Sequence, residues 1–121
     1  MTGGEHRFGR QARLGSRRDF QRPFALGRKF TARNAILWIY SRPEEGAGAR
    51  LGLSVSAKAG AAVRRNRLKR LAREAFRLSR RRLKPESDLV LYLRPGCRWE
   101  SLSDAERDLR ELCQKAGLFT T

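Results

Sequence analysis

The chain has 121 residues, 40% of them apolar, which fits one compact domain with a modest core and argues against a disordered basic tail. Its 28 Lys and Arg residues outnumber its 12 Asp and Glu residues and give a net charge of +16, so we expect a polyanionic partner that offsets the self-repulsion. No apolar run of about 18 residues occurs, so we expect neither a membrane span nor a signal peptide.

The positive charge is concentrated before residue 86. Residues 86–121 contain 7 acidic and 5 basic residues, whereas residues 1–85 contain 5 acidic and 23 basic residues, a net charge of +18. A surface that served only solubility would mix both signs. One part of the molecule is therefore expected to bind anions.

The first predicted element is a helix. Ser16, followed three residues later by Asp19, is a helix-start signal. Phe20 and Phe24 lie four residues apart and share one face of this helix. Pro23 falls inside the segment, where it removes a backbone donor and can kink the chain.

The next two predicted elements are strands. Residues 35–40 are rich in β-branched and aromatic side chains, and residues 43–48 form a loop, consistent with a hairpin to a second strand over residues 51–56. The second strand alternates between apolar and small side chains, which predicts one face on a core and one smooth polar face. The apolar positions are Leu51, Leu53 and Val55, and the small ones are Gly52, Ser54 and Ser56.

From about residue 61 to residue 84 the apolar period changes to 3.6 residues, which predicts a long amphipathic helix. Its expected apolar face consists of Leu68, Leu71, Ala72, Ala75, Phe76 and Leu78. Its opposite face is basic and consists of Lys69, Arg70, Arg73, Arg77, Arg80 and Arg81.

A third strand over residues 88–93 and a last helix complete the domain. The last helix is predicted to start at Ser103, because Glu106 three residues later completes a capping box, and to end at Gly117. The order of helix, strands, helix, strand and helix predicts a single α+β domain.

Residues 64–84 carry the strongest functional signal, with 11 basic residues and Glu74 as the single acid. A charged helix face is usually only solvated, but such faces mix signs and place acids near the helix start, where the helix dipole is positive. Here Arg64, Arg65 and Arg67 occupy that start instead. Backbone donors and arginine side chains both favour phosphate, so we interpret this segment as a phosphate-binding face.

A second group of candidate binding residues is aromatic and consists of Phe20, Phe24, Trp38 and Tyr40. Each of these side chains, taken alone, is more often part of a core than of a binding site. Beside a face of small residues and a basic rim, however, they form a platform typical of single-strand binding, on which bases stack without sequence readout.

Catalysis by the protein's own side chains is not expected. The acids of the basic region are isolated apart from Glu44 and Glu45, and His6 is the sole histidine, so neither a carboxylate-bound metal centre nor a histidine base is expected. Cys97 and Cys113 lack metal-ligand spacing, and we expect two reduced thiols in a cytoplasmic protein.

One stretch of the chain resembles a known family. The matching residues are Gly52-Leu53-Ser54-Val55-Ser56, then Lys58, Gly60 and Val63, then Arg65-Asn66-Arg67-Leu68-Lys69-Arg70-Leu71 with Arg73, Ala75 and Phe76. This pattern, with its central Arg-Asn-Arg block, is similar to that of the bacterial ribonuclease P protein subunit. The likeness extends from Arg13 to the last helix.

The resemblance implies a fold and a domain organisation. It implies three helices and a four-stranded sheet in the order αβββαβα, a ribosomal-protein-like fold with an uncommon left-handed βαβ crossover and a first short strand near residues 28–31. We expect a flexible basic arm over residues 1–13, the RNA-binding domain over residues 14–118 and a tail over residues 119–121.

The resemblance also implies a role. Members of the family pair with a large catalytic RNA that removes the 5′ leader from precursor tRNA and holds most of the Mg²⁺ needed for cleavage. The implied contacts to the RNA subunit are Arg64, Arg65, Asn66, Arg67, Lys69, Arg70 and Arg73. The implied contacts to the leader, which lies in an aromatic cleft, are Phe20, Phe24, Trp38, Ser54, Ser56 and Lys58. No residue is implied to be catalytic or to bind a metal, and we expect no obligate protein partner.

Two other functions stay open at this point. A ribosomal or general RNA-binding protein would carry the same basic helix, and dependence of activity on one particular large RNA would separate the two. A DNA-binding helix module is the second alternative, although the basic helix lacks the paired short helix of such modules and nothing indicates a dimer.

Overall fold

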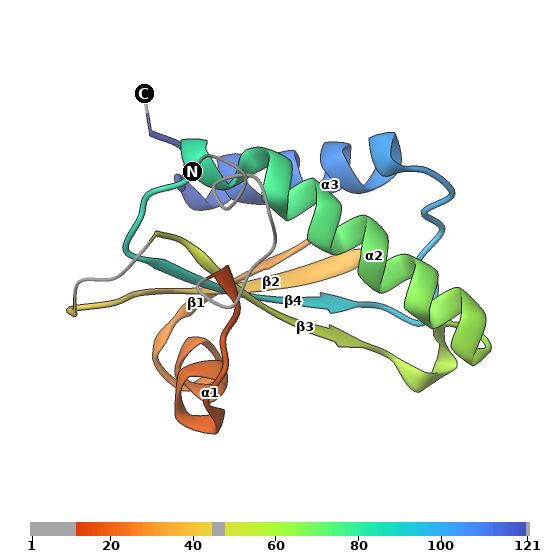
Figure 1. Cartoon of the computed structure of the whole chain (residues 1–121), viewed down its shortest axis with the longest axis horizontal. Helices are drawn as coiled ribbons and strands as arrows, with labels where there is room; N and C mark the ends of the chain where they lie inside the picture. Colours follow the sequence, from red (N-terminus) through yellow and green to blue (C-terminus); the bar gives the residue numbers. More distant parts are fainter. Residues whose placement is uncertain (1–11, 45–47, 121) are drawn as a thin grey trace, which may run out of the picture.

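The computed structural model describes residues 12–44 and 48–120 and places helices on both sides of a sheet (Figure 1). The bounds of the elements are α1 Arg17–Leu26, β1 Arg28–Thr31, β2 Ala35–Ser41, β3 Arg50–Val55, α2 Ala62–Ser79, β4 Ser87–Leu93 and α3 Leu102–Ala116. Short 3₁₀ turns follow β3 at Ala57–Ala59 and α2 at Arg80–Arg82. This order confirms the predicted α+β class and the αβββαβα arrangement.

Within the described residues, the strands form one mixed sheet in the order β1-β2-β4-β3. β4 pairs antiparallel with β2 and parallel with β3, so the hairpin expected between residues 35–40 and 51–56 is wrong. β4 occupies the centre because Leu89, Val90 and Leu91 are buried on both of its faces. Parallel pairing requires a crossover, which α2 supplies, and the left-handed sense of that crossover stays a prediction.

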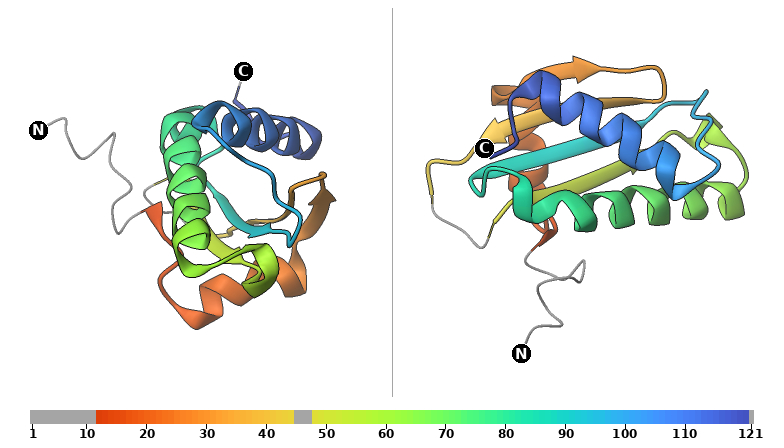
Figure 2. Two further views of the ribbon diagram at one scale, coloured as in Figure 1. Left: turned by 90° about the vertical axis from the view of Figure 1, so that its right-hand side faces the viewer. Right: turned by 90° about the horizontal axis from the view of Figure 1, so that it is seen from above.

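The two faces of the sheet are covered differently. α2 and α3 lie side by side on one face, and α1 lies on the other (Figures 1 and 2). The core fills the space between the sheet and the helix pair. Its largest buried side chains include Leu37, Leu68, Phe76, Leu91, Trp99 and Leu112. Of α1, only Pro23 is buried, so this helix adds little to the core.

α1 starts and ends at short-range signals in the sequence. The Ser16 hydroxyl accepts a hydrogen bond from the Asp19 N–H at 3.0 Å, which confirms the predicted start. Pro23 lies inside the helix without ending it. Gly27 ends it and lies so close to β2 that a Cβ atom there would stand 1.9 Å from the carbonyl oxygen of Ile39. Only glycine therefore allows α1 to turn this closely against the sheet.

The long basic helix is shorter than predicted. Its α-helical part ends at Ser79 rather than near residue 84. Leu78, expected on the apolar face, is 43% exposed and therefore wrongly assigned. At 100° per residue, Leu78 lies at the margin of the apolar arc, whereas Ser79 lies near its centre and is buried.

α3 starts earlier than predicted, because Ser101 and not Ser103 is its N-cap. Ser101 and Asp104 form the capping box: the Asp104 N–H donates to the Ser101 hydroxyl, and an Asp104 carboxylate oxygen accepts from the Ser101 N–H. The buried Trp99 fixes the preceding loop, since its Nε1 donates to Asp108 Oδ2 at 2.7 Å. The predicted end at Gly117 is confirmed, with a left-handed φ of 69°.

The packed region runs from Ala12, which is buried, to Thr120, whose N–H donates to the carbonyl oxygen of Arg82 at 2.8 Å. Leu14 donates its N–H to Leu51 and so extends the sheet beside β3. Most of the arm predicted over residues 1–13 lies outside the described residues. Over the part that is described, no helix is both long enough and apolar enough to cross a membrane.

Candidate nucleic-acid interface

The aromatic residues singled out in the sequence meet between α1 and the sheet. The ring centroids of Phe20 and Phe24 lie 5.9 Å apart, and those of Phe24 and Trp38 lie 4.7 Å apart. Lys29 places its ammonium group 5.6 Å from the centre of the Trp38 ring. Phe24 is 43% exposed, so this cluster presents ring surface to solvent rather than closing into a core. Tyr40 lies apart from it, with its ring against Arg22.

The small side chains of β3 lie on the same face as the aromatic cluster. A Cβ atom at Gly52 would stand 2.6 Å from the ring of Phe20, so the absent side chain makes room for that ring. Ser54 is two residues further along the same face. Ser56 caps the following turn by accepting the Lys58 N–H at 3.1 Å, and the Lys58 side chain is exposed there. The structure therefore orders the three polar candidates along one path that leads away from Phe20.

One residue of this face, Tyr92, was missed by sequence reasoning. Tyr92 pairs across the sheet with Ile36 on one side and Ser54 on the other, and all three are half-buried. The row therefore continues the aromatic surface beyond Trp38. The alternating pattern of β4 could have placed Tyr92 on this face. Asp88, Val90 and Tyr92 occupy one face of the strand, and the leucines between them occupy the other.

An ion network holds α1 against the sheet at the other end of this face. Asp88 is fully buried and accepts from Arg42 at 2.5 Å and from Arg50 at 2.7 and 2.8 Å. Arg50 also donates to Asp19 of α1 at 3.2 Å. Arg22 of α1 lies 3.7 Å from Asp88. Because α1 buries little apolar surface, these charged contacts fix where its aromatic side chains lie.

The network also changes the acidity of Asp19. Burial alone would raise the pKa of this carboxyl, but Arg50, the Ser16 hydroxyl and Arg22 together hold it below its ordinary value. The Asp19 carboxylate therefore stays charged well into the acid range, and the contact between α1 and β3 stays intact at neutral pH.

The start of α2 is strongly cationic, with Arg64, Arg65 and Arg67 in its first two turns. Its N-cap residue, Ala61, offers no side-chain acceptor, so the first N–H groups of the helix keep their bonding capacity. Arg64 donates to the carbonyl oxygen of Cys97 at 3.1 Å, Arg65 to that of Gly60 at 3.2 Å, and Arg67 to that of Glu100. Arg64 also lies 3.7 Å from the Glu100 carboxylate. The guanidinium donors that these contacts leave over are available for phosphate.

The exposed side of α2 carries a shallow hollow of about 360 Å³, lined by Val63, Asn66, Arg70 and Arg73. Val63 is 80% exposed, an unusual position for a large apolar side chain on a basic helix face. Lys69 lies on the same helix, half-buried. The seven residues expected to contact the RNA subunit therefore all lie in the N-terminal two thirds of one helix.

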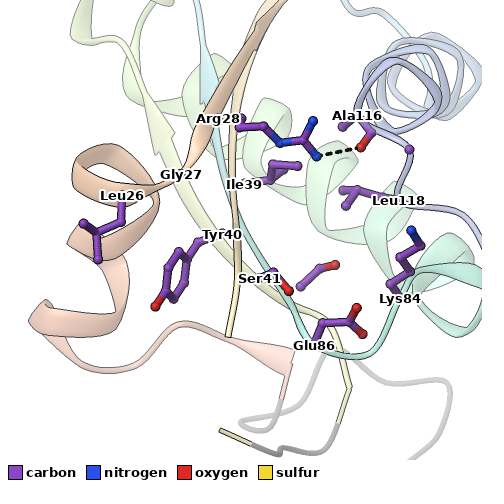
Figure 3. A pocket seen from close by; sticks show the side chains of 12 residues that line it. Leu26, Gly27, Arg28, Ile39, Tyr40, Ser41, Lys84, Glu86, Ala116 and Leu118 are labelled. Atoms are coloured by element: carbon purple, nitrogen blue, oxygen red, sulfur yellow. Dashed lines mark hydrogen bonds between the residues drawn. The ribbon is translucent and has the colours of Figure 1, made fainter. Parts of the chain in front are cut away.

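A further hollow, of about 330 Å³, lies at the opposite end of the sheet, where α1 and α3 end (Figure 3). Its lining mixes charges: Lys84 and Glu86 both face it. Arg28 lies on its edge and donates to the carbonyl oxygen of Ala116 at 3.0 Å. This cation is used inside the fold, so the hollow has little attraction for a polyanion.

Metal-binding clusters and cysteine thiols are the remaining reactive groups to consider among the described residues. No group of three or more His, Cys, Asp and Glu residues among them is arranged to hold a metal ion. Both cysteines are free and buried, and burial raises the pKa of Cys113 to about 12 and also raises the pKa of Cys97. Neither thiol is therefore a nucleophile at neutral pH. The groups exposed on the two candidate surfaces are mainly cations and aromatic rings, which suit binding to nucleic acid.

Comparison with known proteins gives a consistent family. The family model described as Ribonuclease P matches residues 8–117. The ribonuclease P protein component of Clostridium acetobutylicum is 35% identical over 109 residues, which cover 90% of this chain and 92% of that protein. The RNase P protein of Staphylococcus aureus superposes with a TM-score of 0.78 at 28% identity, covering 90% and 98% of the two chains. That of Thermotoga maritima superposes with a TM-score of 0.63 at 29% identity, covering 86% and 93%.

Proposed function

This chain belongs to the ribonuclease P protein family, and we propose that it is the protein cofactor of ribonuclease P, which binds the catalytic RNA subunit and the 5′ leader of precursor tRNA. As a ribonuclease P protein component it is part of a ribonucleoprotein endoribonuclease of tRNA processing, with RNA as its partner in that complex. We further propose two contact surfaces on the protein, cleavage chemistry on the RNA subunit and a cytoplasmic site of action.

The observation that carries the proposal is the uncapped start of α2, surrounded by Arg64, Arg65 and Arg67. An N-terminus without an acidic cap forgoes stability, and three cations there add repulsion from the helix dipole. The phosphates of a bound nucleic acid accept hydrogen bonds from the uncapped N–H groups and also neutralise the arginines, so they offset both costs. We assign this face to the RNA subunit, with Asn66, Lys69, Arg70 and Arg73 continuing it along the helix.

The aromatic cluster is assigned to the leader. Phe20, Phe24 and Trp38 offer ring faces on which successive bases stack, and Ser54, Ser56 and Lys58 border them with hydroxyls and one cation. Stacking of this kind accepts any base, which suits leaders of different sequence. A mature tRNA has no leader and makes no use of this surface.

The cleavage chemistry is assigned to the RNA subunit with its Mg²⁺, because the described residues supply no metal-binding carboxylate group and no histidine base. The protein then acts electrostatically. Its cations neutralise phosphates that would otherwise require additional Mg²⁺ to approach one another.

Reconstitution tests this assignment. Protein alone, a bacterial ribonuclease P RNA alone, and both together are titrated with Mg²⁺ while release of the 5′ leader from precursor tRNA is followed. We expect no cleavage by the protein alone and a lower Mg²⁺ requirement for the mixture than for the RNA. Cleavage by RNase-free protein would overturn the cofactor role, and an unchanged Mg²⁺ requirement would remove the electrostatic mechanism.

The leader surface has a separate test. Trp38→Ala should weaken binding of precursor tRNA to the reconstituted complex by about 1–3 kcal/mol, the value of one base–aromatic stack, and leave mature tRNA nearly unaffected. Leu26→Ala, which removes another exposed apolar side chain of the α1 region, is the matched control and should change neither. Equal losses for precursor and mature tRNA would mean that Trp38 is an ordinary packing residue.

A further inference from the structure

Three loops meet at one end of the sheet, beside the start of α2. Ala35, Leu93 and Val55 form the last row of the sheet, so the loops at residues 32–34, 94–101 and 56–61 all leave from the same end. Figure 2 shows the turn between β1 and β2, the loop before α3 and the N-terminus of α2 gathered at this end. None of the surfaces assigned above includes the first two loops.

These two loops carry arginines that the fold does not use. Arg33 and Arg98 are exposed, and neither side chain makes an ion pair or hydrogen bond with any of the described residues. Together with Arg107 they line a hollow of about 400 Å³, whose other walls are Asn34, Asp104 and Asp108. A hollow of this size accommodates a phosphate with its attached sugar.

The carboxylates of the hollow are already engaged. Asp108 Oδ2 accepts from Asn34 and from Trp99, each at 2.7 Å, and Asp104 Oδ2 caps the start of α3. Their other oxygens both lie 3.6 Å from Arg107. The two acids thus balance Arg107 and the helix start, and Arg33 and Arg98 remain as uncompensated charges.

A buried polar residue fixes the spacing of the two arginines. Asn34, adjacent to Arg33, accepts the backbone N–H of Arg98 on its Oδ1 at 3.0 Å and that of Arg94 on its carbonyl oxygen at 3.0 Å. Burying an amide costs free energy that an apolar residue would not. The hydrogen bonds of Asn34 therefore hold the two arginine-bearing loops in one arrangement before any ligand binds.

The loop that carries Arg98 is hydrogen-bonded to the start of α2. Arg64 and Arg67 donate to the carbonyl oxygens of Cys97 and Glu100, the residues on either side of the Arg98–Trp99 pair. A contact that positions the start of α2 therefore positions Arg98 as well. Trp99 itself is buried, so no aromatic ring is offered for base stacking here.

We propose that Arg33 and Arg98 form a second phosphate-binding site, which grips the backbone of base-paired RNA in the RNA subunit and extends the contact of α2 around the end of the sheet. The inference rests on the proposed function and deepens it. Cations without a stacking ring suit the backbone of a helix rather than a single strand. The protein then contacts the RNA subunit through both the start of α2 and the Arg33–Arg98 site, while the leader binds to the aromatic surface.

The test is the Arg33→Ala, Arg98→Ala double variant, measured for binding to ribonuclease P RNA over a range of salt concentrations. Two lost phosphate contacts should reduce the slope of log affinity against log salt by about 1.8, whereas binding of a single-stranded leader oligonucleotide should not change. The Arg82→Ala, Arg110→Ala double variant removes the same charge from exposed positions elsewhere and serves as the matched control. The Arg33→Lys, Arg98→Lys variant keeps the charges and should restore most of the slope.

Each outcome decides between the proposals. If the test and control variants change the salt slope equally, the effect comes from general surface charge, and the proposed phosphate-binding site is wrong. An equal loss for the single-stranded oligonucleotide would overturn the assignment to base-paired RNA. If the unmodified protein neither binds the RNA subunit nor supports cleavage, the proposed function fails instead. Thermal unfolding midpoints of all variants identify any loss that is due to folding.

Discussion

α2 and α3 lie side by side on the same face of the sheet, but they differ in the residues that stabilise their ends. α3 begins with a capping box, places Asp104 in its first turn and ends in a left-handed glycine. α2 begins at an alanine without a cap, places three arginines in its first two turns and exposes Val63. α3 follows every local rule that stabilises a helix, whereas α2 violates several. A helix that forgoes stability beside a neighbour that does not is the better candidate for binding, so we expect α2 to be the binding helix.

The largest expected effect distinguishes the buried face of the helix pair from its exposed face. Leu112→Ala on α3 removes a fully buried side chain and should destabilise the protein by about 2–5 kcal/mol. Leu78→Ala on α2 makes the same chemical change at a half-exposed site and should cost far less. Chemical denaturation of both variants measures the difference. Similar losses would mean that Leu78 is packed as tightly as Leu112, against its observed exposure.

The caps give the next largest effect. Ser101→Ala should cost about 1 kcal/mol, because it removes the acceptor for the first turn of α3. Ser103→Ala is the control: Ser103 is exposed, lies inside the helix and caps nothing. The free energy of unfolding of each variant settles which serine starts the helix. A larger loss for Ser103→Ala would contradict the observed start.

The missing cap of α2 can be supplied. Ala61 is exposed and has an extended backbone, so Ala61→Ser should stabilise the protein by about 0.5 kcal/mol. Ala61→Asp should stabilise it at least as much, because its charge also suits the helix dipole, but should weaken RNA binding at low salt. Thermal unfolding and RNA titration are compared on the same samples. If the aspartate variant binds RNA as tightly as the serine variant, the start of α2 does not contact phosphate.

The smallest expected effect is a pH dependence of stability that comes from Asp104 in the first turn of α3. The backbone N–H of Glu100, followed by that of Ser101, holds the pKa of Asp104 below its ordinary value of 3.8. A lowered folded-state pKa stabilises the protein above the unfolded value, and this contribution is lost as the pH falls through the folded value. The stability difference between the protein and its Asp104→Asn variant should therefore be constant from neutral pH to about pH 5 and shrink below pH 3.8. A difference that persists at lower pH would assign the effect to shape rather than charge.

Elements with a strong local pattern could be predicted from the sequence, and so could most candidate site residues. The start of α1 at Ser16, the strand alternation around Ser54 and the basic face of α2 all follow from spacing within one element. The start of α3 could not be decided this way, because Ser101 and Ser103 are both followed three residues later by an acid. The choice depends on a tertiary contact, the bond from Trp99 to Asp108.

What the sequence could not reveal depends on contacts between distant segments. The place of β4 between β2 and β3 is a property of the whole sheet, so the nearest two strands were paired wrongly. The ion network of Asp88 joins four segments of the chain, and its only local sign is one acid at the start of an apolar strand. The juxtaposition of Arg33 and Arg98 likewise requires the hydrogen bonds of Asn34.

The position of β4 has a consequence for how the protein comes off the ribosome. β4 is the central strand, but it is the last strand to be synthesised, and β2 and β3 have no other partner on the edges that it fills. Of the strand pairs in the sheet, a nascent chain that ends before residue 87 can form only β1–β2, a hairpin that is marginal on its own. These first residues are also the most basic, with a net charge of +18 over residues 1–85. The polypeptide is therefore most exposed to stray RNA before β4 and α3 are complete, because neither the sheet nor the core between the sheet and the helix pair can form earlier.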